Sequence, residues 1–244
     1  MRVDAFAIKL RRRGNMEAAD LGVRLCQSVA RQVYACYLTA ALPVIAISLA
    51  CFELATWLPT LLMWWLKPWL DRTVLFVLSR AAFAQRTTVA DLLRAQRHVW
   101  WSQLSSTMTI RRLSPWRSFT QPVFQLEGLA AGLRRRRLSQ IRAGTTGTGL
   151  LITNAYSIIE LSLVVALVSL VFWFAPTGME PDLSALFMND EETQVELAIA
   201  IAYAIVIAGL EPFYVASGFG LYLNRRAELE AWDIEQEFRR AFAR

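Results

Sequence analysis

Long, nearly uncharged stretches constrain this chain more than any other feature of its sequence. Residues 150–175 carry a single charged side chain, Glu160, and residues 197–223 carry only Glu211. Residues 33–56 form a further apolar stretch. About 20 predominantly apolar residues are enough to cross the hydrocarbon core of a bilayer. These stretches therefore predict helices that span a membrane.

Composition supports the same class of protein. Charged residues make up 19% of the 244 residues, below the roughly 25% of soluble domains, and the mean hydropathy is positive at +0.35. We therefore predict an all-α fold, a polytopic transmembrane helical bundle of about four spans. A cytoplasmic insert rich in arginine and a cytoplasmic C-terminal helix complete this prediction.

The segment 58–83 is long and aromatic, but charged residues interrupt it. Lys67 and Asp71 lie four residues apart, a spacing that allows them to pair on one helix face, and Arg72 follows directly. One interpretation is a second span with a charged middle, which we favour. The alternative is a re-entrant hairpin, which a membrane tolerates only where protein or water covers the backbone.

The order of these stretches divides the chain into five segments. They are a basic N-terminal segment (1–32), two membrane segments or a re-entrant hairpin (33–83), a basic insert (84–149), a transmembrane hairpin (150–224) and an amphipathic tail (225–244). The hairpin contains an acidic loop at 176–194, and its second helix is predicted to break at Glu211-Pro212. Within the insert we expect helices over 89–108 and 123–138, with a loop over 114–122.

Arginine and lysine predict the orientation of the chain. The N-terminal segment holds seven basic residues, the insert 11 and the tail five, whereas the loop 176–194 holds none. Basic residues accumulate in cytoplasmic loops, so both termini and the insert are predicted to face the cytoplasm of a bacterial inner membrane. The number of crossings before the insert must then be even.

Polar side chains within the apolar segments are the first candidate site. Ionisable groups at this depth are costly, and they usually face the bundle interior and mark function. The alternative is structural, with Glu160 and Glu211 either protonated or paired with Lys67, Arg72 or Arg80 to hold the bundle together. The candidates are Glu53, Lys67, Asp71, Arg72, Asn154, Glu160 and Glu211.

Arginines of the insert form the second candidate site. Basic residues at a cytoplasmic membrane edge each contribute about 1 kcal/mol toward anionic lipid, and an acidic protein partner is the alternative ligand. The tail adds an apolar stripe at helical spacing that can dock on the insert or on a partner. The basic candidates are Arg111, Arg112, Arg117, Arg134, Arg135, Arg136, Arg137 and Arg142, and the docking candidates are Ala231, Ile234, Phe238 and Phe242.

Several chemistries find no support in the sequence. His98 is the only histidine, and the three cysteines form no CxxC pair, so a zinc site or a catalytic cysteine–histidine pair is not expected. No motif for a catalytic serine or for nucleic-acid binding is present. We therefore predict a protein without a cofactor, without a nucleic-acid partner and without enzymatic activity.

The C-terminal half resembles a group of uncharacterised bacterial inner-membrane proteins. The resemblance lies in RLSPWRSF from Arg112 to Phe119, in QLEGL from Gln125 to Leu129, and in FYV from Phe213 followed by LYLNRRAELEAWDIE from Leu221 to Glu235. Members resemble accessory membrane proteins encoded near MoxR-type AAA+ ATPases and transglutaminase-related membrane proteins. The resemblance implies a partner-binding role and assigns no activity to particular residues.

Two functions are consistent with these features. The first is a scaffold or accessory subunit that presents a basic cytoplasmic surface to lipid headgroups or to a protein. The second is a small transporter or ion-coupled channel that uses the intramembrane carboxylates Glu160 and Glu211. The arginine-rich insert and the absence of catalytic groups favour the first, which we predict, and the intramembrane carboxylates favour the second as the alternative.

Overall fold

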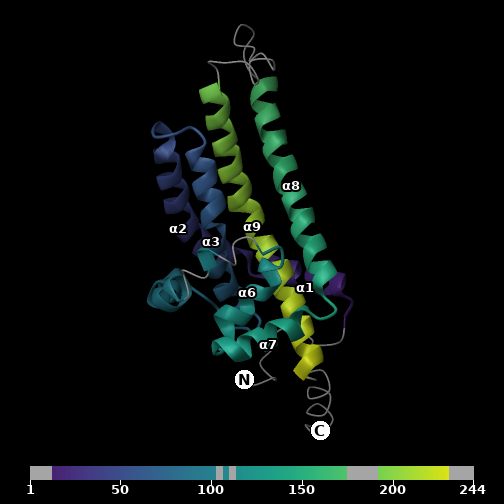
Figure 1. Cartoon of the computed structure of the whole chain (residues 1–244). Helices are drawn as coiled ribbons and strands as arrows, with labels where there is room; N and C mark the ends of the chain where they lie inside the picture. Colours follow the sequence, from purple (N-terminus) through teal and green to yellow (C-terminus); the bar gives the residue numbers. More distant parts are fainter. Residues whose placement is uncertain (1–12, 103–106, 110–113, 175–191, 231–244) are drawn as a thin grey trace.

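A computed structural model describes residues 13–102, 107–109, 114–174 and 192–230 of the chain. All regular elements in these ranges are helical. Four long helices, α2 (Ala30–Ala50), α3 (Leu58–Ala81), α8 (Thr146–Trp173) and α9 (Glu192–Glu230), run alongside one another (Figure 1). The shorter α1 (Asn15–Ser28), α6 (Arg117–Leu126) and α7 (Ala131–Arg142) gather at one end of this bundle.

Three helices are long and apolar enough to cross a membrane, and they lie within residues 30–53, 146–170 and 193–230. The chain is thus a helical protein whose described part is compatible with a membrane. The fourth long helix, α3, has 24 residues, a length of about 36 Å at 1.5 Å per residue. It carries Lys67, Asp71 and Arg72 in its middle, which lowers its apolar character.

The helix α9 runs through Pro212 without a break, so the predicted interruption at Glu211-Pro212 is wrong. It is also longer than the span expected to end at residue 224, because its 39 residues continue to Glu230. A proline inside a helix leaves one carbonyl without its usual partner. Packing against α1, α3, α6 and α8 nevertheless holds α9 in one continuous helix.

The insert differs from its predicted helices. The region expected to form one helix over 89–108 contains α4 (Val89–Arg94) and a π-helical turn, η3 (Arg97–Trp101). Contacts of Arg72 explain why this region is not one continuous α-helix. The Arg72 guanidinium donates hydrogen bonds to the backbone carbonyls of Val99 and His98. These two carbonyl oxygens therefore accept hydrogen bonds from a side chain of α3, and not only from backbone N–H groups of their own helix.

The predicted loop over 114–122 is also wrong in part, because α6 begins at Arg117 and contains Pro122. Burial stabilises this short helix, since Phe119 and Val123 are almost completely buried against the bundle. Gly128 ends the region with a φ of 58°, a left-handed conformation that favours glycine. The helix predicted over 123–138 is therefore divided between α6 and α7.

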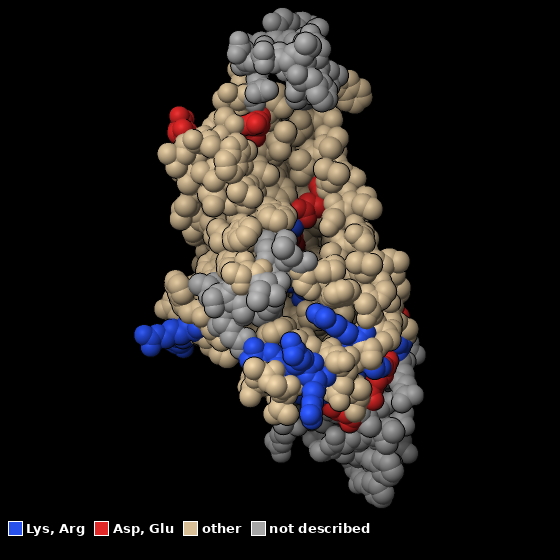
Figure 2. All heavy atoms as spheres, viewed as in Figure 1, with Lys and Arg blue, Asp and Glu red and all other residues tan. Residues whose placement is uncertain are grey.

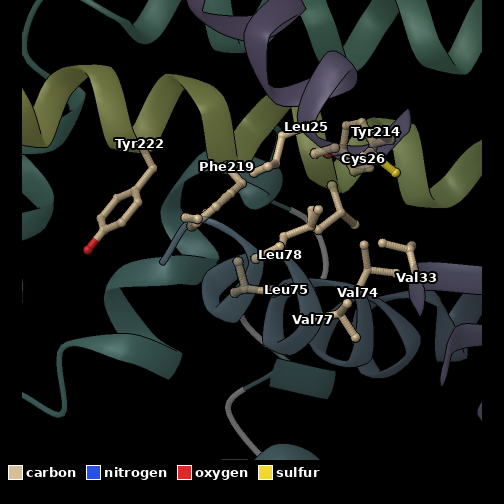
Figure 3. Packing of buried hydrophobic residues seen from close by; sticks show 14 of the residues in the cluster. Leu25, Cys26, Val33, Val74, Leu75, Val77, Leu78, Tyr214, Phe219 and Tyr222 are labelled. Carbon is tan, nitrogen blue, oxygen red and sulfur yellow. The ribbon is translucent and has the colours of Figure 1, made fainter. Parts of the chain in front are cut away.

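The hydrophobic core lies where α1, α3 and α9 meet. Figure 3 shows Leu25 and Cys26 of α1 beside Leu75 and Leu78 of α3 and Phe219 of α9. Leu25 and Cys26 of α1 thus pack on the bundle. A second, smaller core forms between α3 and the first half of α9, around Met63, Tyr203 and Ile207.

Candidate functional site

Charged side chains from three long helices meet at one ammonium group. Lys67 Nζ of α3 lies 2.6 Å from Glu160 Oε2 of α8 and 2.7 Å from Glu211 Oε2 of α9. The side chains of Lys67 and Glu211 are only 9% and 3% exposed. Distances this short between ionised groups mark strong hydrogen bonds. Lys67 therefore links α3, α8 and α9. This confirms the alternative in which Glu160 and Glu211 pair with Lys67, in place of the suggested pairing of Lys67 with Asp71 within α3.

A second cation completes the cluster from outside the long helices. Arg117, at the first position of α6, lies 3.1 Å from Asp71 Oδ2 through Nε and 3.1 Å from Glu211 Oε1 through Nη2. Its guanidinium also lies over the ring of Tyr214, 5.4 Å from the centroid. Burial by itself lowers the pKa of Arg117, but Asp71, Tyr214, Glu211 and Glu160 together outweigh it, so the pKa lies above its usual value. Arg117 is therefore a permanent cation.

This position corrects the prediction for Arg117. The sequence assigned it to a basic surface, but its side chain is only 10% exposed and faces acidic partners inside the bundle. The cause is the start of α6, which brings the N-terminal turn of that helix against α9. The five residues Lys67, Asp71, Arg117, Glu160 and Glu211 are called the ion-pair cluster below.

Charge is not balanced within the ion-pair cluster, which contains three carboxylates and two cations. Asp71 is fully buried, and neither of its carboxylate oxygens makes a well-formed hydrogen bond within the described residues. Arg72, the neighbour of Asp71, directs its guanidinium away from the cluster, to the carbonyls of His98 and Val99 and to the hydroxyl of Thr107. An excess of carboxylates over cations in a low-dielectric site favours uptake of a proton or another cation.

The ion-pair cluster forms one wall of a cavity between α3, α8 and α9. The cavity has a volume of about 920 Å³, and Figure 2 shows charged atoms inside a hollow on the viewed face. Its lining is mainly apolar and aromatic, with charged groups concentrated at the cluster. The lining includes Trp57, Leu61, Trp64, Lys67, Arg117, Tyr156, Glu160, Val164, Glu196, Ile199, Tyr203, Glu211 and Tyr214.

Glu196 adds a carboxylate that sequence analysis missed. It lines the same cavity from the first turns of α9, about 22 Å along the helix from Glu211 at 1.5 Å per residue. Its Oε2 atom is buried and accepts no hydrogen bond within the described structure. The sequence signal was present, since Glu196 lies just before the apolar run 197–223. Its position near a helix end made it resemble an ordinary interfacial residue.

Two of the predicted intramembrane polar residues lie away from this site. Asn154 is exposed on α8, and Glu53 is exposed in the short helical turn Cys51–Glu53 between α2 and α3. Asn154 points away from the site because it lies six residues from Glu160, so the two side chains project in different directions from α8. The structure thus brings together Lys67, Asp71, Glu160 and Glu211, and leaves Arg72 in a neighbouring contact with the insert.

The arginines of α7 have different environments. Arg135 and Arg136 are exposed, whereas Arg134 and Arg142 are half-buried and lie over the rings of Phe124 and Trp116. Arg137 pairs with Glu127 and with Glu230, at the last position of α9. Figure 2 shows basic residues gathered toward this end of the molecule. Arg111, Arg112 and the tail residues Ala231, Ile234, Phe238 and Phe242 lie outside the described residues.

Metal binding is not indicated by the described part of the chain, in which no group of three or more histidine, cysteine or acidic residues is arranged to hold an ion. No family model, no curated protein and no solved structure matches the sequence. The site can therefore be judged only by its own geometry. Its chemistry is that of buried, exchangeable charge beside an apolar cavity.

Proposed function

We propose that this protein is a non-enzymatic, ion-coupled transporter of a bacterial inner membrane. In this proposal α2, α3, α8 and α9 cross the membrane, and α1, α6, α7 and both termini lie on the cytoplasmic side. The arginine counts support the orientation, because the basic residues belong to the segments at one end of the bundle.

The observation that carries the proposal is the excess of carboxylates over cations beside the cavity. Pocket-lining polar groups that converge in an apolar cavity are the usual mark of a ligand site. Ionisable residues inside a membrane bundle commonly form proton or substrate pathways. Glu160 is the most accessible carboxylate of the ion-pair cluster, with 18% of its side chain exposed. We assign it the proton that is exchanged with the cavity.

Proton flux into proteoliposomes tests this function directly. Vesicles containing the full-length protein and a trapped pH indicator are given a potassium diffusion potential. Wild-type protein should acidify the interior faster than protein-free vesicles, and Glu160→Gln should reduce the rate to that of empty vesicles. Asn154→Ala removes a polar group from an exposed face of the same helix and should transport like wild type. A Glu160→Gln variant with wild-type flux excludes Glu160 from the mechanism.

A scaffold role is the second candidate, and the exposed Arg135 and Arg136 favour it. Arg137 is occupied by Glu127 and Glu230, so the available basic surface is smaller than the sequence suggested. Arg135→Gln/Arg136→Gln should weaken binding of the detergent-solubilised protein to vesicles containing anionic lipid. Arg24→Gln, whose exposed side chain pairs with Asp20, provides the matched control. Equal binding by all three proteins excludes this surface as the ligand site.

A further inference from the structure

We infer that the cavity between α3, α8 and α9 binds a lipophilic organic cation. This inference rests on the proposed transport function and names its class of substrate. Three properties of the cavity carry the inference: its size, the sign of its charge and its aromatic lining. Each property excludes a different class of ligand.

Size and polarity exclude a simple inorganic ion as the only ligand. A volume of about 920 Å³ is near the upper end of the range for small-molecule sites. Leu61, Leu161, Val164 and Ile199 supply apolar surface along the walls. Apolar surface of this extent gains free energy when it is removed from water against an apolar molecule. The body of the ligand is therefore hydrophobic.

Charge at the cavity selects a cation. Three carboxylates line it, at Glu160, Glu196 and Glu211, against the two cations Lys67 and Arg117. Both cations are already engaged by acidic partners. Behind them Asp71 engages Arg117 without lining the cavity, which reduces the positive charge that Arg117 presents there. An anionic ligand would meet this negative field in a low-dielectric site, whereas a cation would neutralise it.

Glu196 and Glu160 have different roles in the binding of the cation. Glu196 lies toward the end of α9 remote from Arg117, and its buried Oε2 has no hydrogen-bond partner among the described residues. A carboxylate in this position attracts a cation toward the cavity. Glu160 then binds the charged group of the ligand at the inner end of the cavity. Among the described ion pairs, Glu160 is engaged only by Lys67. The ligand displaces a proton or loosens the Glu160–Lys67 contact as it binds.

Aromatic side chains supply the second type of cation contact. Trp57 and Trp64 line the cavity from the start of α3, and Tyr156 and Tyr214 line it from α8 and α9. Tyr214 already lies under the guanidinium of Arg117, which shows that its ring is used as a cation surface. Attraction between a cation and an aromatic face grows stronger when water is excluded. Organic cations with diffuse charge suit such a lining.

Binding of two ions of the same shape and opposite charge tests the inference. Full-length protein in an uncharged detergent is dialysed to equilibrium against tetraphenylphosphonium or tetraphenylborate. We expect saturable binding of tetraphenylphosphonium at one site, with tetraphenylborate bound no more than by empty micelles. Glu160→Gln and Glu196→Gln should each lower the affinity for the cation about tenfold, as expected for loss of one charged contact.

Controls separate binding from folding. Glu196→Gln breaks no ion pair of the ion-pair cluster, so it keeps the test informative if Glu160→Gln fails to fold. Glu53→Gln removes an exposed carboxylate from the turn between α2 and α3 and should bind tetraphenylphosphonium like wild type. Trp64→Leu keeps apolar volume without the aromatic face and should weaken cation binding. Equal binding of both ions, or wild-type affinity in both glutamate variants, overturns the inference.

The flux experiment distinguishes failure of the ligand class from failure of the function. Proton flux that depends on Glu160, together with no tetraphenylphosphonium binding, overturns the lipophilic cation and keeps the transporter. Saturable binding without any flux supports the site and overturns ion-coupled transport. Co-purified phospholipid that fills the cavity and resists exchange with tetraphenylphosphonium also overturns the inference, because the cavity would then be a structural lipid site.

Discussion

The ammonium group of Lys67 contacts carboxylates from two other helices at once. Both contacts are shorter than 2.8 Å, and the lysine is 7% exposed as a whole residue. A buried ion pair contributes little net stability relative to apolar residues, but removal of one partner leaves an uncompensated charge. Lys67 is thus expected to matter more for the integrity of the bundle than any exposed cation.

Lys67→Met should destabilise the protein by about 3–5 kcal/mol, the usual effect of breaking a buried pair. Thermal unfolding in detergent, followed by circular dichroism, measures the change. Adding Glu160→Gln to the same chain removes the carboxylate whose described ion-pair partner is Lys67 and should recover part of the loss. As a control, Arg24→Met disrupts an exposed pair with Asp20 and should cost less than about 1 kcal/mol. Equal effects of both single substitutions would contradict the role of Lys67.

Cys26 offers a pH-dependent test of the packing of α1. Burial raises the pKa of its thiol to about 11, and the thiolate is the form that reacts with maleimides. Alkylation of Cys26 in the folded protein should therefore be slow near neutral pH and should accelerate as the pH rises toward about 11. Peptide mass spectrometry after timed labelling measures the rate, with the partly exposed Cys51 as the internal reference. Rapid labelling of Cys26 at neutral pH would show that α1 leaves the bundle.

At the scale of single elements, the crossing of α1 and α9 depends on small residues. A Cβ atom added at Gly22 would lie 2.0 Å from the backbone oxygen of Ala216, and one added at Gly220 would lie 2.2 Å from that of Ala18. Each helix thus places two small residues four positions apart, Ala18 and Gly22 on one and Ala216 and Gly220 on the other. This spacing is the small-xxx-small pattern of close helix packing in membranes.

Gly220→Ala should destabilise the protein by about 1–3 kcal/mol, the typical effect of overpacking, because backbone atoms cannot move aside as a flexible side chain can. Gly209→Ala is a matched control in the same helix, since a Cβ there meets nothing within 4 Å. Alanine has the higher helix propensity by about 1 kcal/mol, so this control should be neutral or stabilising. Unfolding in detergent compares the two variants, and a shared direction of change would refute the close crossing.

On the scale of the whole molecule, the two ends of the bundle have different characters. The exposed Arg135 and Arg136 of α7 lie at one end, and the exposed Glu53 lies in the turn between α2 and α3 at the other. If α2 and α3 both cross, these positions face opposite sides of the membrane. The proposed orientation assigns α7 to the cytoplasm.

Cysteine labelling in intact cells tests this arrangement. Single cysteines are introduced as Glu53→Cys or Arg136→Cys after the three native cysteines are replaced by serine. A membrane-impermeant maleimide should label the first variant in intact cells and the second only after the membrane is permeabilised. The reverse result contradicts the orientation. Absence of labelling of Glu53→Cys in intact cells, with labelling after permeabilisation, contradicts full crossing by α2 and α3.

Local pattern by itself predicted the helical class, the apolar spans and the presence of charge inside them. Segments such as 150–175 and 197–223 predict membrane spans because about 20 consecutive apolar residues have few other stable environments. The presence of Glu160 and Glu211 inside apolar segments was equally visible, since an ionisable residue inside such a run stands out. The spacing Ala216-xxx-Gly220 was not predicted to mark a contact, because a small-residue spacing does not identify its partner helix.

Only the tertiary structure decided which charges meet. Arg117 lies in a segment whose composition suggests a basic surface, yet the start of α6 brings it to Asp71 and Glu211, 46 and 94 residues away along the chain. Lys67 had an acidic neighbour four residues along its own helix and instead pairs across the bundle. Partner choice among buried charges depends on distances between helices and on the shape of the cavity they enclose, and neither quantity is encoded in the periodicity of any one segment.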